Sequence, residues 1–224
     1  MSPAISRFLV LGAGGHGRVV ADLVRAIGHE VVGYSELDSG RVGATADATG
    51  TRVVLDQRTA LACVRGEQPW PLGIDMLALG VGDNTARARL LAQIGHAMLP
   101  PLVHPGSWVS GSAWLGPGTV VLAGAVINTG ATLEGATIVN SGAVVEHDCV
   151  LKEAVHISPN ATLCGAVSVG ARSWVAAAAV IVPGRTIGAD CVVGAGAVVI
   201  RDVPDGCTVV GNPARPIHHD RRRG

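Results

Sequence analysis

The fold of the C-terminal half is decided by a stretch that repeats every six residues, VNSGAVVEHDCVLKEAVHISPNATL at residues 139–163. The register extends in both directions without a slip, and all sixteen positions in it are aliphatic: Val109, Leu115, Val121, Ile127, Leu133, Val139, Val145, Leu151, Ile157, Leu163, Val169, Val175, Ile181, Ile187, Val193 and Val199. The residue two places earlier is usually small, as in Ala125, Ala143 and Ala161. Neither an α-helix nor a hairpin meander has a period of six, whereas a triangular solenoid does. The period predicts a left-handed parallel β-helix of about five coils, with three hexads in each coil.

The first hundred residues have a different pattern, in which apolar runs alternate with helical periodicity. It predicts strands at Arg7–Leu11, Val31–Tyr34 and Met76–Val81, and helices at 19–27, 58–65 and 85–94. This order is typical of a Rossmann-like βαβαβα half domain with a parallel sheet. We therefore expect an α/β domain over 1–97, a proline-containing linker over 98–108, the β-helix over 109–204, and a C-terminal turn and tail over 205–224.

The composition agrees with tightly stacked coils and limits the classes of function. Of 224 residues, 48% are apolar but only 3% are aromatic, and 31 are glycine. The formal net charge is zero, which gives no general attraction to nucleic acid or an anionic membrane. The longest apolar run, Val175–Pro183, is too short to span a bilayer. We interpret Arg221–Arg223 and the pair His218-His219 as a solvated tail.

Five cysteines lie in apolar surroundings, without a CxxC pair or metal-ligand spacing: Cys63, Cys149, Cys164, Cys191 and Cys207. They predict free thiols in a reducing compartment, hence a cytoplasmic protein. No charged and apolar leader opens the chain, and we expect no metal requirement.

A glycine-rich loop predicts a nucleotide site in the first domain. Gly12, Gly14 and Gly17 satisfy G-x-G-x-x-G between a strand and a helix, where backbone N–H groups can approach an anion. NAD is the usual ligand of this motif. We favour a different nucleotide, because the domain is half the usual size and the acidic position after the second strand offers only Ser35, Glu36 and Asp38.

Within the coils, polar residues are expected to lie at corners, so a histidine there is informative. His147 is flanked by Glu146 and Asp148, and His156 follows half a coil later. A carboxylate beside an imidazole can fix its tautomer and raise its basicity, as a general base requires. The alternative interpretation is that both histidines are solvated corner residues. A thiol nucleophile at Cys149 or Cys164 is a remote option.

Four motifs in one order carry a resemblance to a known family. They are G-A-G-G-H-G at 12–17, G-D-N-x-x-R at 82–87, V-x-E-H-D at 144–148 within the hexads, and G-N-P-A-R-P at 211–216. Together they resemble the NeuD and PglD family of sugar acetyltransferases, over essentially the whole chain.

The resemblance implies a homotrimer with active sites between neighbouring β-helices, acetyl-CoA as donor and a nucleotide-linked amino sugar as acceptor. It implies that His147 is the general base and Asp148 its partner, and that acetyl-CoA contacts His156, Ala177 and Ala195. Contacts with the nucleotide sugar are implied for Gly14, Gly15, His16, Ser35, Glu36, Gly82 and Asn140. Many relatives carry two aspartates in place of Ser35 and Glu36, and a glutamate in place of Asp148.

From this resemblance we expect direct N-acetylation of the 4-amino group of a nucleotide-linked 4-amino-4,6-dideoxyhexose, in lipopolysaccharide, capsule or glycan synthesis. The alternative within the family is O-acetylation of a sialic acid or a related sugar. Two alternatives from other classes are a non-catalytic β-helix scaffold and an NAD-dependent enzyme.

Overall fold

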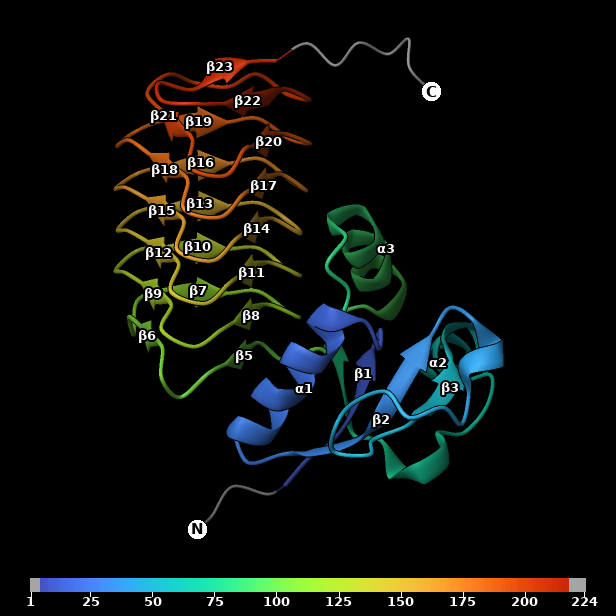
Figure 1. The fold of residues 1–224 in the computed structure, drawn as a ribbon. Helices are drawn as coiled ribbons and strands as arrows, with labels where there is room; N and C mark the ends of the chain where they lie inside the picture. The colour runs from blue at the N-terminus through green and yellow to red at the C-terminus, as the bar shows by residue number, and fades with distance from the viewer. Residues whose placement is uncertain (1–4, 218–224) are drawn as a thin grey trace, which may run out of the picture. The chain divides into compact units, whose positions relative to one another are not determined.

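The computed structural model describes residues 5–217, and the chain divides into two compact units, Met1–Pro105 and Gly106–Gly224. The first is an α/β unit and the second is the left-handed parallel β-helix that the sequence predicts (Figure 1). The predicted tail residues 218–224 lie outside the described residues. The four-segment division of the chain stays a prediction.

The α/β unit is built on one four-stranded parallel sheet with the strand order β3-β2-β1-β4. Its elements are, in chain order, β1 (Arg7–Leu11), α1 (Gly15–Ala26), β2 (Glu30–Glu36), β3 (Val53–Asp56), α2 (Gln57–Val64), β4 (Met76–Leu79) and α3 (Asn84–Ile94), with short 3₁₀ turns at Ser39–Arg41 and Pro71–Gly73. A further short strand, β5 (Leu102–Val103), follows α3. The central strand β1 and the edge strand β4 are almost fully buried, as expected for a parallel sheet.

The structure corrects the predicted element order at one place. The sequence predicted three strands in strict alternation with helices, whereas a fourth strand, Val53–Asp56, follows β2 without an intervening α-helix. The strand is only four residues long and ends in Asp56, whose carboxylate caps α2 by accepting the N–H of Thr59. A run this short, fused to a helix cap, carries too little periodicity to be separated from the loop around it.

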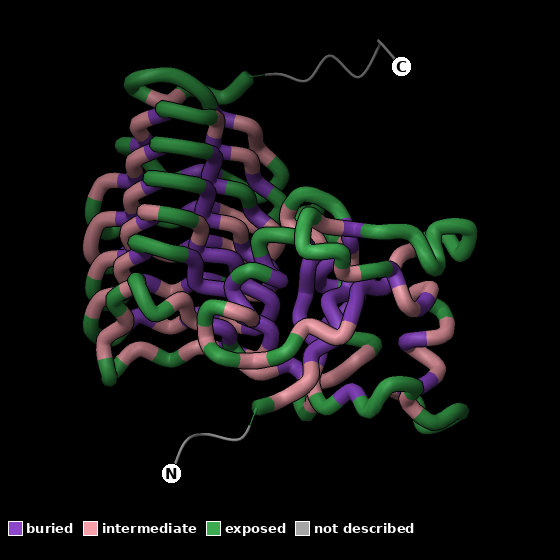
Figure 2. The backbone as a smooth tube through the Cα atoms, turned by 60° about the horizontal axis from the view of Figure 1, so that its bottom comes forward, coloured by how far each residue is buried: buried purple, intermediate pink, exposed green. Residues whose placement is uncertain are grey.

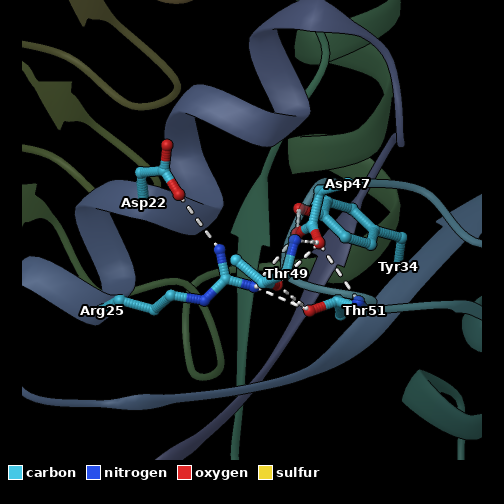
Figure 3. A network of polar contacts seen from close by, with 6 residues as sticks. All are labelled: Asp22, Arg25, Tyr34, Asp47, Thr49 and Thr51. Carbon is cyan, nitrogen blue, oxygen red and sulfur yellow. Dashed lines mark hydrogen bonds and ion pairs between the residues drawn. The ribbon is translucent and has the colours of Figure 1, made fainter.

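A partly buried ion pair connects the loop between β2 and β3 to helix α1 of the α/β unit (Figure 3). The guanidinium of Arg25 on α1 donates to the Asp47 carboxylate at 3.0 Å, and the Tyr34 hydroxyl on β2 donates to the same carboxylate at 2.6 Å. Thr49 and Thr51 complete the hydrogen bonding of both charged groups. Asp47 is 6% exposed, and these donors hold its pKa well below the usual range.

The β-helix winds through three faces in turn, each made of two-residue strands in parallel register except at the C-terminal end of the third face. The first face carries β6 (Trp108–Val109), β9 (Val126–Ile127), β12 (Val144–Val145), β15 (Thr162–Leu163), β18 (Val180–Ile181) and β21 (Val198–Val199). The second carries β7 (Trp114–Leu115), β10 (Thr132–Leu133), β13 (Val150–Leu151), β16 (Ser168–Val169) and β19 (Thr186–Ile187). The third carries β8 (Val120–Val121), β11 (Ile138–Val139), β14 (His156–Ile157), β17 (Trp174–Val175), β20 (Val192–Val193), β22 (Thr208–Val210) and β23 (Arg215–Pro216).

The hexad residues form the core of the prism, as predicted. From Val121 to Val199 each of them is at most 1% exposed, and hexad residues eighteen apart pair in successive coils, as Val139, Ile157 and Val175 do. Figure 2 shows buried stretches of the backbone recurring along the β-helix. The small residues two places earlier are buried at the corners, for example Ala143 and Ala161. In each strand the first residue points outward, because side chains alternate along an extended chain. Residues on the axis therefore hold the coils together, and only corners and outward positions are available for chemistry.

The corners repeat one backbone conformation every six residues. Asp148, Ala154, Asn160 and Ala166 all have φ between 55° and 59° in this series. Asp and Asn adopt left-handed backbone more readily than alanine, since their short polar side chains can bond locally. Asp148 thus occupies an ordinary corner of the fold, and its conformation needs no functional explanation.

The last coil ends in a turn at Gly211-Asn212-Pro213. β22 and β23 pair antiparallel around residues 211–214, and the Asn212–Pro213 peptide is cis. All five cysteines are free, three of them buried and two half-buried. Among residues 5–217, no helix combines the length and hydropathy needed to cross a bilayer.

Candidate active site

Six of the predicted substrate residues gather at the carboxyl edge of the α/β sheet. Gly14, Gly15 and His16 form the N-terminus of α1, Ser35 and Glu36 end β2, and Gly82 follows β4. Open α/β sheets bind ligands at this edge. The seventh predicted residue, Asn140, lies in the β-helix unit.

In the glycine loop at residues 12–17, some glycines are required by packing within the chain and others are not. A Cβ on Gly17 would lie 1.9 Å from the Gly12 carbonyl oxygen, so only glycine lets α1 approach the end of β1 this closely. A Cβ on Gly14 or Gly15 would meet nothing within 4 Å. Packing within the chain does not require glycine at those two positions, and the space beside them is open to a ligand.

His16 and Arg87 are two largely buried polar side chains at the carboxyl edge of the sheet. Burial, together with the Arg87 charge, lowers the pKa of His16 to about 4, so the imidazole is neutral at neutral pH. Arg87 is fully buried and donates to the carbonyl oxygens of Val81 and Gly82 at 3.2 and 3.0 Å, which fixes the loop after β4. Asp83 caps α3 by accepting the N–H of Ala86 at 2.7 Å. The G-D-N-x-x-R motif is thus one structural device that positions Gly82.

Ser35 and Glu36 lie beside the glycine loop in different ways. The Glu36 carboxylate accepts the N–H of Ala13 at 3.0 Å and pairs with Arg41 at 3.2 Å. Ser35 is 1% exposed, and its hydroxyl oxygen has no hydrogen-bond partner among the described residues. Glu36 therefore shapes the loop through a backbone contact.

His147 and Asp148 lie at the corner that links β12 on the first face to β13 on the second. The His147 Nδ1 atom is 2.9 Å from Asp148 Oδ2, and both side chains are more than half exposed. A surface contact this exposed contributes little to stability. A carboxylate bonded to Nδ1 selects the tautomer that carries its proton there, which leaves the lone pair on Nε2 for an incoming donor.

Gly165 makes room for the His147 ring. It lies one coil further on at the same corner, and a Cβ there would be 2.4 Å from His147 Nε2. The φ angle of Gly165 lies outside the left-handed region, so its backbone conformation does not itself require glycine. Sequence reasoning missed this residue, although the six-residue period places position 165 directly over position 147.

His156 points outward from the third face and has a fixed orientation. Its Nε2 atom lies 3.1 Å from the Asn140 amide nitrogen, and the Asn140 amide oxygen accepts the N–H of Ser141. This arrangement makes His156 Nε2 the acceptor and places the ring proton on Nδ1. The ring stacks on Trp174, with centroids 6.5 Å apart, and Trp174 in turn donates to the Ser158 hydroxyl at 2.6 Å.

The predicted acetyl-CoA residues lie together, but apart from His147. Ala177 and Ala195 occupy the edge between the third and first faces in successive coils, where Gly196 N–H donates to the Ala177 carbonyl. His156 lies on the third face beside that edge. His147 lies at the edge between the first and second faces, which is opposite the third face of a triangular prism. Within one chain, the structure does not bring the predicted base and the predicted acetyl-CoA groove together.

The remaining candidates from the sequence have no catalytic geometry. Burial raises the pKa of Cys149 to about 11, and its thiol donates to the Cys164 carbonyl at 3.2 Å. Such a thiol is a poor nucleophile. Over the described part of the chain, no three His, Cys, Asp or Glu side chains gather as metal ligands.

A coil of hexads that carries an exposed imidazole–carboxylate pair, joined to a small α/β unit with an open glycine loop, defines the class of hexapeptide-repeat acyltransferases. Comparison with known proteins narrows the class. The family model described as "PglD N-terminal domain" matches residues 7–94. Together with the solved structures that follow, it shows that this chain belongs to the NeuD/PglD-like family of acetyl-CoA-dependent sugar acetyltransferases.

Two solved structures are similar over almost the whole chain. PerB from Caulobacter crescentus, in complex with CoA and GDP-perosamine, is 38% identical with a TM-score of 0.83, covering 96% of this chain and 99% of that chain. The acetyltransferase domain of PglB from Neisseria gonorrhoeae, in complex with acetyl coenzyme A, is 36% identical with a TM-score of 0.83, covering 96% and 100%.

A putative acetyltransferase from Schizosaccharomyces pombe matches a smaller segment. It is 48% identical over 44 residues, which are 20% of this chain and 21% of that protein. A second putative acetyltransferase, from Saccharomyces cerevisiae, matches to a similar extent. The match thus spans about a fifth of the length of these curated relatives.

Proposed function

We propose that this protein transfers the acetyl group of acetyl-CoA to the 4-amino group of a nucleotide-linked 4-amino-4,6-dideoxyhexose. The observation that carries the proposal is the exposed His147–Asp148 pair, which leaves Nε2 as a proton acceptor at a corner of the β-helix. The Caulobacter neighbour, solved with CoA and GDP-perosamine, supports an amino sugar as the acceptor. The product would supply lipopolysaccharide, capsule or glycan synthesis in the cytoplasm, where reducing conditions keep thiols free.

In the proposed reaction, the neutral amine attacks the thioester carbonyl carbon directly. His147 Nε2 removes a proton from the attacking nitrogen, while Asp148 holds Nδ1–H and stabilises the imidazolium that forms. The C–S bond breaks as the tetrahedral intermediate collapses, and the coenzyme A sulfur leaves with the proton. Corner backbone N–H groups would stabilise the oxyanion. No covalent enzyme intermediate is needed.

We propose that the transfer site forms between two copies in a homotrimer. The first face has His147 at one edge and Ala177 and Ala195 at the other. The outward side chains of this face are mostly half-buried aliphatic residues, such as Val126, Val144 and Val180. If this face turns toward a threefold axis, the acetyl-CoA edge of one copy meets the His147 edge of the next. A contact between two different edges is heterologous, and it closes into a ring of three copies when it repeats around a threefold axis.

In the α/β unit, we propose that Gly14, Gly15, His16 and Gly82 contact the nucleotide sugar. The support is their common position at the carboxyl edge, the open space beside the two glycines and the α1 N-terminus, which favours phosphate. Ser35 adds a buried hydroxyl without a partner among the described residues. We propose that Asn140 acts by orienting His156.

The experiment that tests the proposal measures release of the CoA thiol against a panel of acceptors. The panel contains nucleotide-linked 4-amino sugars, the corresponding 4-hydroxy sugars and free sialic acids. We expect turnover with the 4-amino sugars alone, and mass spectrometry should show one added acetyl group on nitrogen. Turnover with sialic acids or hydroxy sugars, and none with amino sugars, would replace the proposal by O-acetylation. Failure to bind acetyl-CoA at all would favour a scaffold role.

A further inference from the structure

We propose that Cys191 and Cys207 form a disulfide when the protein meets peroxide, and that this bond staples the C-terminal cap of the β-helix to its last full coil. The C-terminal cap is residues 208–216, which hold β22, the turn after it and β23. The proposal concerns the end of the β-helix and is independent of the proposed acetyl transfer.

The two cysteines occupy equivalent positions in successive coils of the third face. Val192 in β20 pairs with Thr208 in β22 in parallel register, and the residues just before them are Cys191 and Cys207. The Val192 N–H donates to the Cys207 carbonyl at 2.9 Å, which fixes this alignment. All five cysteines are among the described residues, and no other two of them face each other across neighbouring strands.

The backbone spacing at this position suits a disulfide. Neighbouring strands lie about 4.7–4.9 Å apart, within the Cα separation of about 4.4–6.8 Å that a disulfide spans. Cys191 and Cys207 each stand two places before an axis residue, Val193 and Val209, so both side chains occupy the same corner of the prism. The two Cβ atoms must approach by about 1 Å. β22 can take up this shift, because its outer neighbour is only the two-residue strand β23.

The hydrogen bonds along this corner leave the last sulfur available. Ser173 holds the same position one coil before Cys191, and its hydroxyl donates to the Gly188 carbonyl at 2.6 Å. The buried Cys191 thiol makes the equivalent contact and donates to the Pro204 carbonyl at 3.0 Å. Cys207 ends the column, is half-buried, and has a thiol without a hydrogen-bond partner among the described residues. An oxidant therefore reaches Cys207 first.

The proposed oxidation consumes one hydrogen peroxide for each disulfide. The Cys207 thiolate attacks one peroxide oxygen, the O–O bond breaks, and Cys207 becomes a sulfenic acid as hydroxide leaves. The Cys191 sulfur then attacks the sulfenic sulfur, so the S–S bond forms and the S–O bond breaks. The two thiol protons leave in the two waters formed, and the two sulfurs supply the two electrons that reduce the peroxide. Burial raises the pKa of the Cys191 thiol, in keeping with its place in the second step.

The staple acts on the end of the β-helix, where support is weakest. A terminal coil has a neighbouring coil on one side only, so a solenoid opens most readily at its ends. Two hydrogen bonds from Val198 hold the turn of the cap: its N–H donates to the Gly211 carbonyl at 3.0 Å, and its carbonyl accepts the Ala214 N–H at 2.8 Å. A covalent bond from Cys191 to Cys207 closes a loop around the last coil and makes its opening less favourable.

The test exposes the reduced full-length protein to a small excess of hydrogen peroxide and then removes the oxidant. Trypsin cleaves after Arg201, between the two cysteines, so mass spectrometry of the unreduced digest detects the bond directly. We expect the protein mass to fall by about 2 Da, and one peptide pair to be joined through Cys191 and Cys207. The melting temperature should rise by about 5–10 °C and return to its first value when dithiothreitol reduces the bond.

Two variants separate the pair from the other thiols. Cys207→Ser should lose both the joined peptides and the rise in melting temperature, while its reduced form melts within a few degrees of the reduced wild type. The matched control is Cys164→Ser, because Cys164 is also half-buried in the β-helix but faces no cysteine. This control should keep both effects.

Four results would overturn the inference. Peroxide could leave every thiol reduced, or oxidise Cys207 further without joining it to Cys191. The bond could join other cysteines or two separate chains. It could form between Cys191 and Cys207 without raising the melting temperature, or the rise could persist in Cys207→Ser. None of these measurements reads acetyl transfer, so their outcome is distinct from that of the proposed function.

Discussion

The two units of this protein arrange their candidate residues in opposite ways. In the α/β unit, six residues far apart in sequence meet at one edge of one sheet, because the carboxyl ends of parallel strands lie side by side. In the β-helix, His147 and His156 are only nine residues apart in sequence but lie on opposite sides of the prism. One chain therefore brings the predicted nucleotide-sugar residues together, whereas the proposed transfer site requires a second copy.

The difference follows from how each fold turns the chain. A parallel sheet collects its loops at one end, so residues from many segments converge there. A three-sided coil places residues eighteen apart in a column, and it separates neighbours in sequence onto different faces. Function on such a solenoid is expected at edges that face another copy.

The largest expected effect tests the transfer side of this comparison. Replacement of the imidazole in His147→Ala should lower kcat by at least about a hundredfold, since general-base help contributes about 10²–10⁴-fold. The KM for acetyl-CoA should change little. The matched control is His96→Ala, which removes an exposed histidine outside the coils and should retain wild-type kcat. Turnover of the His147 variant near the wild-type rate would remove His147 from the mechanism.

A smaller effect is expected when the ring is displaced rather than removed. In Gly165→Ala the new Cβ would lie 2.4 Å from His147 Nε2, so the imidazole must move while the backbone stays acceptable. We expect kcat to fall about tenfold to a hundredfold, because a shift of about 1 Å can cost that much. The melting temperature should stay within a few degrees of the wild type. A variant with unchanged kcat would show that the ring position seen here is not the reactive one.

The smallest effect concerns the α/β edge and depends on pH. Burial and the Arg87 charge lower the pKa of His16 from 6.5 to about 4 in the folded protein. The unfolded chain takes up a proton near pH 6.5 and the folded one does not, so the contribution to stability is present above 6.5 and is lost as the pH falls toward 4. The loss is on the order of 3 kcal/mol at most.

Melting temperatures between pH 7.5 and 4.5 measure this effect, with His16→Asn as the comparison. The wild type should lose stability over the range, and the variant should lose less because its side chain does not titrate. Parallel curves for the two proteins would mean that His16 is not buried in its neutral form.

Much of the fold could be predicted from the sequence, because the hexad register sets which side chain faces the axis. Every hexad position from Val121 to Val199 is buried, as the period requires. The strand Val53–Asp56 could not be found, since four residues that end in a helix cap carry no clear periodicity. The role of Arg87 was also hidden, because a buried arginine that bonds backbone carbonyls has no local sequence signature.

Part of the candidate site could be predicted as well. The pairing of His147 with Asp148 follows from their adjacency, and the geometry confirms the contact. The contact of Asn140 with His156 was not foreseen. The six-residue period could have indicated it, because His156 pairs with Ile138, two residues before Asn140, on the neighbouring strand of the third face. The roles assigned to these residues in catalysis stay predictions.

The most direct test of a transfer site shared between copies is complementation in mixed oligomers. One chain carries His147→Ala, and the other carries Ala177→Trp, which fills the proposed acetyl-CoA groove at the exposed edge. Each variant alone should be inactive. Co-expressed and purified through two different tags, mixed trimers should recover about one third of the wild-type turnover per trimer, because one interface in three combines the two intact edges. Mixed oligomers no more active than either variant alone would contradict a site formed between two chains.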